Sequence, residues 1–386
     1  MVWNRKLKQL MGSATRAVQQ ALRQPAGQPL RAQPARQADP PPAPTATMPT
    51  GFPFHSIAHW PGQRATQAED AATAEASPGA PQPSPAEPPG SFTRVAFTQP
   101  DALHPHAHHY HLYVPPAATA GGARPLLLML HGCTQTPADF AAGTGMNEAA
   151  ARANVLVLYP EQTHRANRHG CWNWFRPEDQ RRDRGEPGLL MAMVQDVMAR
   201  HRVDAGRIYV AGLSAGGAMA ALLAREYPDV FAAAGVHSGL PAGAAHNMMT
   251  ALSAMKHGAQ PHARTQPVAS PGQRVVPVIV FHGDADEAVH ARNGDQVVAA
   301  TLGSLVGGAA VLDQVVEQGA SPAGQLYTRT VYRRALISGG RVVAEHWLLR
   351  GGGHAWSGGS AQGSYTDPAG VSATDEMLRF FLSHRR

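Results

Sequence analysis

The stretch Gly212-Leu213-Ser214-Ala215-Gly216 decides the fold, because of what stands on either side of it. Residues 207–211 (RIYVA) before it are typical of a buried strand, and residues 215–226 after it predict a helix. A strand, a G-x-S-x-G turn and a helix form a nucleophile elbow, in which small residues let the chain turn sharply and hold a serine hydroxyl above the sheet. The alternative is a structural glycine-rich turn. We interpret Ser214 as a candidate nucleophile.

Short apolar runs recur along the chain after residue 91, and helical stretches separate several of them. Runs that are apolar on both faces and alternate with helices indicate a mainly parallel sheet covered by helices on both sides. The sequence therefore predicts an α/β catalytic domain over residues 91–386. Residues 241–277 fit an insertion near the carboxyl edge of the sheet, where ligands bind in this class. The expected strands are 110–114, 126–130, 155–159, 208–211, 232–236, 278–281 and 346–349, and the expected helices are 188–200, 215–226 and 371–383.

Residues 1–90 form a leader of different composition. Of the 33 prolines, 17 fall in residues 1–100, among Ala, Gln, Ser and Gly, which predicts a disordered, Pro-rich segment. Residues 2–24 place apolar side chains at spacings of three and four, as in an amphipathic helix with cations on the other face. This helix either associates weakly with a surface or lies loosely on the domain. It has no unbroken apolar stretch of seven residues, so no secretory signal peptide is recognisable.

The charge of the chain is concentrated in the leader. The formal net charge is +6, but residues 1–36 carry seven basic groups and no acid, which leaves a net charge of −1 on the rest. A basic excess confined to a tail argues against a nucleic-acid groove. No apolar run approaches the roughly 18 residues of a membrane span. We expect a soluble protein with no nucleic-acid partner, and the sequence indicates no oligomeric state.

A serine hydroxyl is a weak nucleophile until a base takes its proton and a third group orients that base. Residues 282–287 (HGDADE) follow an expected strand and supply the acid. Asp286 is favoured because it lies farther round the turn and can reach across to a histidine loop. Asp284 is the alternative, although its position suits a cap of the turn.

The base is expected on another loop that follows a strand. Residues 351–356 (GGGHAW) place His354 after the expected strand 346–349. The order Ser214, Asp286, His354 is that of α/β-hydrolases and differs from the order in the chymotrypsin and subtilisin families. We therefore predict a catalytic triad on an α/β-hydrolase fold, with no cofactor and no metal.

The same chemistry needs an oxyanion hole, in which backbone N–H groups each lower the barrier by roughly 3 kcal/mol. One N–H comes from the residue after the nucleophile, Ala215. The other is expected from residues 131–135 (HGCTQ), with Cys133 favoured and Thr134 as the alternative.

The remaining candidates keep two interpretations each. The two cysteines, Cys133 and Cys171, are either bonded to each other or free buried thiols. The tryptophans Trp172, Trp174 and Trp356 either line a substrate groove or pack in the core. The histidines of residues 104–111 suit a solvated strand better than a metal site. Three further histidines that end or follow strands are expected to bond the backbone: His131, His237 and His282.

Several motifs in this order resemble the esterases of the poly(3-hydroxybutyrate) depolymerase family, which is similar to feruloyl and acetylxylan esterases. They are residues 110–115 (YHLYVP), 131–135 (HGCTQ), 171–175 (CWNWF), 212–217 (GLSAGG), 237–239 (HSG), 353–356 (GHAW) and 364–368 (SYTDP). The resemblance covers about residues 108–383. It implies carboxylic ester hydrolysis through Ser214, Asp286 and His354, and it favours the disulfide between Cys133 and Cys171.

The resemblance also sets the functional hypotheses. The first is a serine esterase that acts on polyhydroxyalkanoate oligomers or small esters. The alternatives are a feruloyl or acetylxylan esterase, an acyltransferase that uses the same triad, and a non-catalytic protein that coats polyester granules through its leader. The resemblance favours an extracellular location, and the alternative is the cytoplasm because no signal peptide is visible.

Overall fold

The computed structural model describes residues 89–99, 107–116, 121–260, 274–305, 312–334 and 340–386. They belong to one compact unit. The expectations for residues 1–88, for His104 and His106, and for most of the second half of the 241–277 insertion lie outside the described residues. Within the described part of the chain, no helix is long and apolar enough to cross a membrane.

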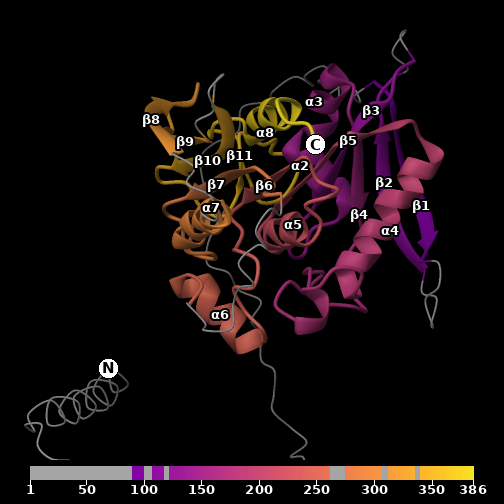
Figure 1. Ribbon diagram of the computed structural model, residues 1–386, viewed down its shortest axis with the longest axis horizontal. Helices are drawn as coiled ribbons and strands as arrows, with labels where there is room; N and C mark the ends of the chain where they lie inside the picture. The colour runs from indigo at the N-terminus through magenta and orange to yellow at the C-terminus, as the bar shows by residue number, and fades with distance from the viewer. Residues whose placement is uncertain (1–88, 100–106, 117–120, 261–273, 306–311, 335–339) are drawn as a thin grey trace, which may run out of the picture. The chain divides into compact units, whose positions relative to one another are not determined.

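A ten-stranded sheet forms the centre of the fold, with the strand order β1-β2-β4-β3-β5-β6-β7-β10-β9-β8 (Figure 1). The strands from β4 to β10 in this order are parallel, whereas β1 and β2 at one edge and β9 and β8 at the other join the sheet antiparallel. The bounds are β1 Ser91–Thr98, β2 Ala107–Val114, β3 Arg124–Leu130, β4 Leu156–Pro160, β5 Val203–Leu213, β6 Ala233–His237, β7 Val278–Gly283, β8 Leu312–Ala320, β9 Leu326–Arg334 and β10 Arg341–Leu349.

All seven expected strands are present, and the three strands of this sheet that were not expected, β1, β8 and β9, lie at its two ends. The side chains of β8 are mostly exposed. Because a strand exposed on both faces needs no apolar run, its sequence carries little periodic signal. The chain order reverses at β3, since β4 lies on one side of it and β5 on the other. In open α/β sheets such a reversal opens a crevice at the carboxyl ends of the strands.

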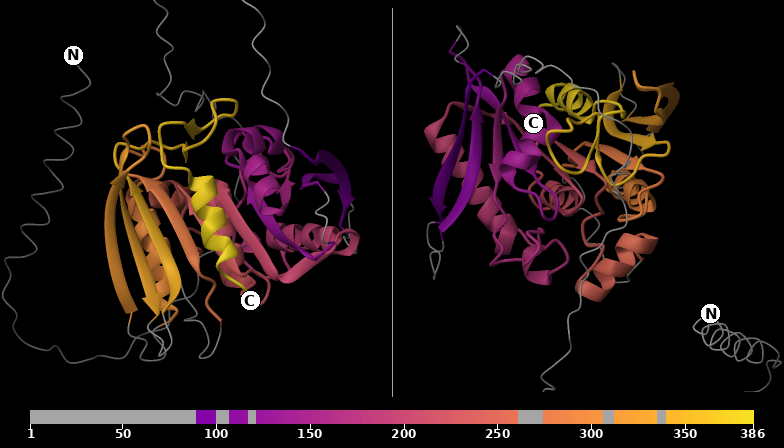
Figure 2. Two further views of the ribbon diagram at one scale, coloured as in Figure 1. Left: turned by 90° about the horizontal axis from the view of Figure 1, so that it is seen from above. Right: turned by 180° about the vertical axis from the view of Figure 1, so that it is seen from behind.

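Helices cover both faces of the sheet (Figure 2). Helices α4, α5 and α7 contribute to one hydrophobic cluster, and α2, α3 and α8 contribute to a second one. These layers make the architecture an α/β-hydrolase fold, as expected. The bounds are α2 Pro137–Thr144, α3 Met146–Ala153, η1 Pro177–Asp179, α4 Gly185–Arg200, α5 Ala215–Glu226, α6 Met248–His257, α7 Arg292–Gly303 and α8 Ala373–Leu382, and two short strands, β11 Trp356–Ser357 and β12 Thr366–Asp367, pair with each other.

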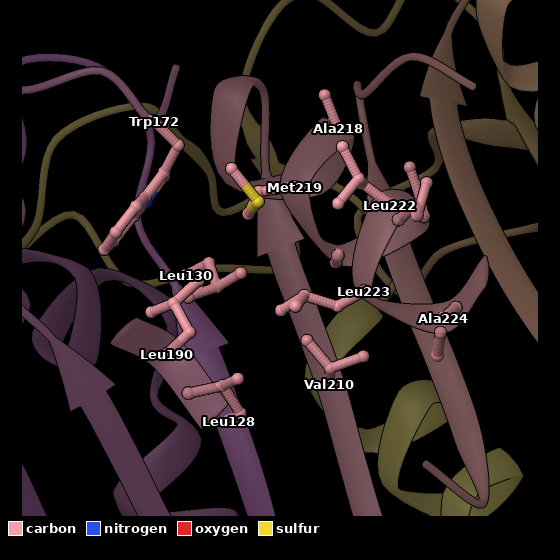
Figure 3. Packing of buried hydrophobic residues seen from close by; sticks show 14 of the residues in the cluster. Leu128, Leu130, Trp172, Leu190, Val210, Ala218, Met219, Leu222, Leu223 and Ala224 are labelled. Carbon is pink, nitrogen blue, oxygen red and sulfur yellow. The ribbon is translucent and has the colours of Figure 1, made fainter. Parts of the chain in front are cut away.

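The strand that leads to Ser214 is buried on both faces. Val210 of β5 packs into the first cluster and Tyr209 into the second, as the two-residue period of a strand requires. Figure 3 shows Val210 beside Leu223 of α5, with Leu128 and Leu130 of β3 near by. Helix α5 is therefore fixed against the two strands whose ends approach the serine.

A buried carboxylate holds the loop between β4 and α4. Both oxygens of Glu186 accept hydrogen bonds, one from the Gln162 amide at 2.6 Å and the other from the Asn173 N–H at 2.7 Å. The Gln162 amide also donates to the carbonyl of Cys171 at 3.0 Å. Burial and the nearby Asp179 raise the pKa of Glu186 to about 7, against the effect of these donors.

We predict that Glu186 makes stability fall as the pH rises from about 4.5 to about 7. Its pKa in the folded chain lies above the ordinary value of 4.5, so the folded state retains the proton in this range and the unfolded state does not. In Glu186→Gln the group does not titrate. The melting temperature of the variant minus that of the wild type should therefore increase between pH 5 and pH 8. A difference that stays constant over this range would contradict the assignment.

Candidate active site

Ser214 lies at the turn between β5 and α5, with backbone angles of φ 57° and ψ −118°. This conformation costs a residue with a side chain about 1–3 kcal/mol, so neighbouring contacts must impose it. A Cβ atom on Gly216 would lie 2.0 Å from the carbonyl oxygen of Leu130, and one on Gly212 would lie 2.4 Å from the backbone of Gly216. Only glycine fits at these two crossings. The predicted strand, turn and helix at residues 207–226 are present.

Asp286 and His354 meet across two loops that follow parallel strands. The Nδ1 of His354 donates to Oδ2 of Asp286 at 2.8 Å, and Oδ1 accepts the N–H groups of Ala288 and Val289 at 2.9 and 2.8 Å. The Asp286 side chain is fully buried, whereas that of His354 is 18% exposed. Burial would raise the pKa of Asp286, but the nearby His282 and the hydrogen bond from His354 outweigh it and hold that pKa well below its usual range.

The alternative acid, Asp284, makes different contacts. Its Oδ1 accepts the N–H of Gly351 at 2.7 Å, and its Oδ2 lies 3.2 Å from a guanidinium nitrogen of Arg350. It therefore joins its own turn to the start of the His354 loop and does not contact the imidazole. The structure brings Asp286, and not Asp284, to His354.

His237 connects the elbow to the His354 loop. Its carbonyl oxygen accepts the N–H of Ser214 at 2.9 Å, and its ring Nε2 accepts the N–H of Ser357 at 3.0 Å. The ring lies stacked between Phe281 and Trp356, with centroid distances of 5.7 and 5.1 Å. Burial lowers the pKa of His237 to about 3, so the ring stays neutral and keeps Nε2 as an acceptor.

The loop after β3 passes beside the serine, because a Cβ atom on Gly132 would lie 3.7 Å from the Cβ of Ser214. The N–H of Thr134 donates to a carbonyl of the neighbouring loop at 2.8 Å and is therefore already engaged. Among the described residues, no acceptor is found for the N–H groups of Cys133 and Ala215. These two amides can bind an oxyanion.

Cys133 and Cys171 form a disulfide, with an S–S distance of 2.11 Å. The bond joins the loop after β3 to the loop after β4. In this structure the two cysteines are therefore bonded to each other and are not free thiols.

The three other histidines that were expected to bond the backbone do so. The Nε2 of His131 accepts the N–H of Gln162 at 3.2 Å, and the Nε2 of His282 lies 2.7 Å from the carbonyl oxygen of Val289. His237 accepts a backbone N–H as described above. Of the described residues, no group of three or more His, Cys, Asp or Glu side chains is arranged to hold a metal ion.

The three tryptophans that were candidates for a substrate groove lie in the core. Trp172 and Trp356 are each 1% exposed and Trp174 is 6% exposed. Figure 3 shows Trp172 above Leu130 in the first cluster. All three side chains therefore pack in the core in this structure.

Tyr365 lies next to residues 131–135, and nothing in the sequence indicated this contact. The residue is 42% exposed, and its hydroxyl lies 3.2 Å from Oγ1 of Thr134 in the loop of residues 131–135. The backbone beside it is fixed, because Ser364 donates to both carboxylate oxygens of Asp139, at 2.9 and 2.6 Å. In the sequence, Tyr365 belongs to the motif at residues 364–368, which assigned it no role.

Known esterases are similar in sequence to the central part of this chain. The family model described as esterase PHB depolymerase matches residues 108–315. Poly(3-hydroxyalkanoate) depolymerase C of Paucimonas lemoignei is 41% identical over 134 residues, which is 35% of this chain and 32% of that protein. Feruloyl esterase B of Thermothelomyces thermophilus is 33% identical over 122 residues, which is 31% of this chain and 41% of that protein. The matches thus span about a third of the length of these relatives.

A solved structure supports the fold independently. An acetyl xylan esterase from Aspergillus awamori superposes with a TM-score of 0.57 at 19% identity, over 76% of this chain and 100% of that one. At this identity the similarity concerns the fold alone. Because the family model covers more than half of the residues, including the elbow and the Asp286 loop, the chain belongs to the esterase PHB depolymerase family.

Proposed function

We propose that this protein is a serine carboxylic ester hydrolase of the poly(3-hydroxybutyrate) depolymerase type. The observation that carries the proposal is the hydrogen bond of 2.8 Å between Asp286 and His354, formed at the sheet edge where Ser214 lies in a strained turn. A buried carboxylate that orients an imidazole is the part of a catalytic triad that prepares the base for a serine hydroxyl.

In the proposed mechanism, His354 removes the proton of Ser214 as the oxygen attacks the ester carbonyl. The Nδ1 of the imidazole is bound to Asp286, so Nε2 is the nitrogen that takes the proton. The N–H groups of Cys133 and Ala215 stabilise the oxyanion. The imidazolium then protonates the leaving alcohol and an acyl-enzyme remains. Water activated by the same imidazole releases the acid and restores the serine.

The substrate class follows from the relatives. A poly(3-hydroxyalkanoate) depolymerase is the relative quoted above with the higher identity, so we propose hydroxyalkanoate oligomers or small esters as substrates. A feruloyl esterase is also a relative, so a feruloyl or acetylxylan ester is the second candidate. Acyl transfer to an alcohol uses the same acyl-enzyme and would appear as a second product when alcohol is added.

The disulfide supports an extracellular location, because such bonds persist in oxidising compartments and are rare in the cytosol. A surface role for the basic leader is a separate proposal. Deleting residues 1–36 and measuring binding to polyester granules tests it, and unchanged binding would exclude it.

The proposed function predicts hydrolysis of hydroxybutyrate oligomers with an acyl-enzyme at Ser214. Purified protein should release monomer or dimer from such oligomers and cleave short p-nitrophenyl esters, with methyl ferulate and acetylated xylan assayed beside them. A serine-directed phosphonate should label wild type and not Ser214→Ala, which should lose at least about 10³-fold in kcat. Full activity in Ser214→Ala would exclude the mechanism. A clear preference for methyl ferulate would favour feruloyl esters over hydroxyalkanoate oligomers as substrates.

The two aspartates that follow β7, Asp284 and Asp286, provide a matched pair of variants. Asp286→Asn should lower kcat by about 10³ to 10⁴-fold, because the imidazole loses the group that sets its tautomer and orientation. Asp284→Asn should stay within about fivefold of the wild type and lower mainly the melting temperature, since Asp284 holds a turn. Kinetics with one soluble ester compare the two. The opposite ranking would assign the acid to Asp284.

Reduction of the disulfide should lower both turnover and stability. A bond that closes a loop of 38 residues contributes roughly 4 kcal/mol on the chain-entropy model, and this one holds the loop that presents the Cys133 N–H. Cys171→Ser separates the effect on structure from any chemistry of the reductant. We expect both kcat and the melting temperature to fall in this variant. A kcat equal to that of the wild type would show that the amide is positioned without the bond.

A further inference from the structure

His282 is a buried titratable side chain that the proposed chemistry does not use. It lies near the end of β7, and its side chain has no exposed surface. Its Nε2 is 2.7 Å from the carbonyl oxygen of Val289 and 3.5 Å from Oδ2 of Asp286. A carbonyl oxygen can only accept, so Nε2 carries the hydrogen.

This contact connects His282 to Asp286 through the backbone of Val289. The N–H of Val289 donates to Oδ1 of Asp286, and the carbonyl of the same residue accepts the hydrogen bond from His282. The imidazole thus holds the backbone group that orients the carboxylate. Its Nε2 also approaches the oxygen that His354 binds.

The other side of the ring is held by packing. A Cβ atom on Gly294 of α7 would lie 2.9 Å from Nδ1 of His282 and 3.2 Å from Nε2 of His346. Among the described residues, no hydrogen-bond partner is found for Nδ1 of His282. Helix α7 therefore limits movement of the ring away from Asp286, and the polar contacts of the ring lie on the side of the acid.

We propose that His282 is a positioning residue, which acts through Val289 and Asp286 to fix the carboxylate that orients His354. The inference rests on the proposed function, because it concerns the same triad. In this proposal, His282 affects kcat only by holding Asp286 in position.

The first test compares variants that remove the donor with one that keeps it. His282→Leu has a similar volume and no donor, and the side chain of His282→Asn is too short to reach the Val289 carbonyl. The side chain of His282→Gln places an amide N–H close to the position of Nε2. We expect the first two to lower kcat on a soluble ester by 10-fold to about 100-fold with KM within about twofold, since a misplaced catalytic group has such a cost. His282→Gln should recover kcat to within about threefold of the wild type.

His346→Leu is the matched control. His346 lies on the neighbouring strand β10 and is 8% exposed, and its Nε2 would lie 3.2 Å from the same Cβ atom on Gly294 of α7. No contact between it and Asp286 is found among the described residues. This variant should lower the melting temperature and leave kcat within about twofold. An equal loss of kcat in His346→Leu and His282→Leu would overturn the proposal, because packing alone would then explain both.

A double-mutant cycle gives the decisive result. If His282 acts through Asp286, its replacement should cost little once Asp286→Asn has removed the carboxylate. The same fold-loss in both backgrounds would overturn the proposal, as would a wild-type kcat in both donor-deleting variants. Failure of the proposed function gives a different pattern, because Asp286→Asn and Ser214→Ala would then both retain full activity.

Discussion

The site depends on the close approach of the first turn of α5 to the carboxyl end of β3. The position where a Cβ atom of Gly216 would stand is 2.0 Å from the Leu130 carbonyl oxygen. Because no side chain fits there, the chain must turn within two residues of β5, and Ser214 takes a positive φ. The same approach brings the loop that follows Leu130 beside the serine, since a Cβ atom on Gly132 would lie 3.7 Å from the Cβ of Ser214.

The acid and the base come from separate loops, and buried polar contacts set their relative position. His237 binds the backbone on both sides, at Ser214 and at Ser357, while its ring is stacked in a row of aromatic side chains. Such a neutral, fully buried acceptor is costly to leave unpaired, by roughly 1–3 kcal/mol, so each of its contacts reinforces the other. The loop that carries His354 is therefore held relative to the elbow, which is what the proposed triad requires.

The sequence predicted those parts of the molecule whose signal is local. The central strands are apolar on both faces and the elbow has a strict spacing, so both were recognisable, and the position of Asp286 beyond Asp284 followed from the reach of a turn. Other features depend on tertiary contacts. Strand β8 is exposed and carries no apolar period. Trp172 is buried and Tyr365 is exposed because of the loops that pack around each of them. The local sequence of a loop does not show whether an aromatic side chain in it will be buried or exposed.

Two buried carboxyl groups, Asp286 and Glu186, differ in how readily they ionise. On the acid side, Asp286 is buried among donors that keep its carboxylate ionised. On the oxyanion side, Glu186 accepts from Gln162 and Asn173, but burial and Asp179 outweigh those donors and raise its pKa to about 7. A buried carboxylate that resists ionisation is a poor source of stability by itself. An apolar side chain at position 186 would nevertheless leave several donors buried without an acceptor, at a cost of roughly 1–3 kcal/mol each. Glu186 therefore costs less than an apolar residue at this position. It stabilises the loop that carries Cys171, and the disulfide joins that loop to Cys133.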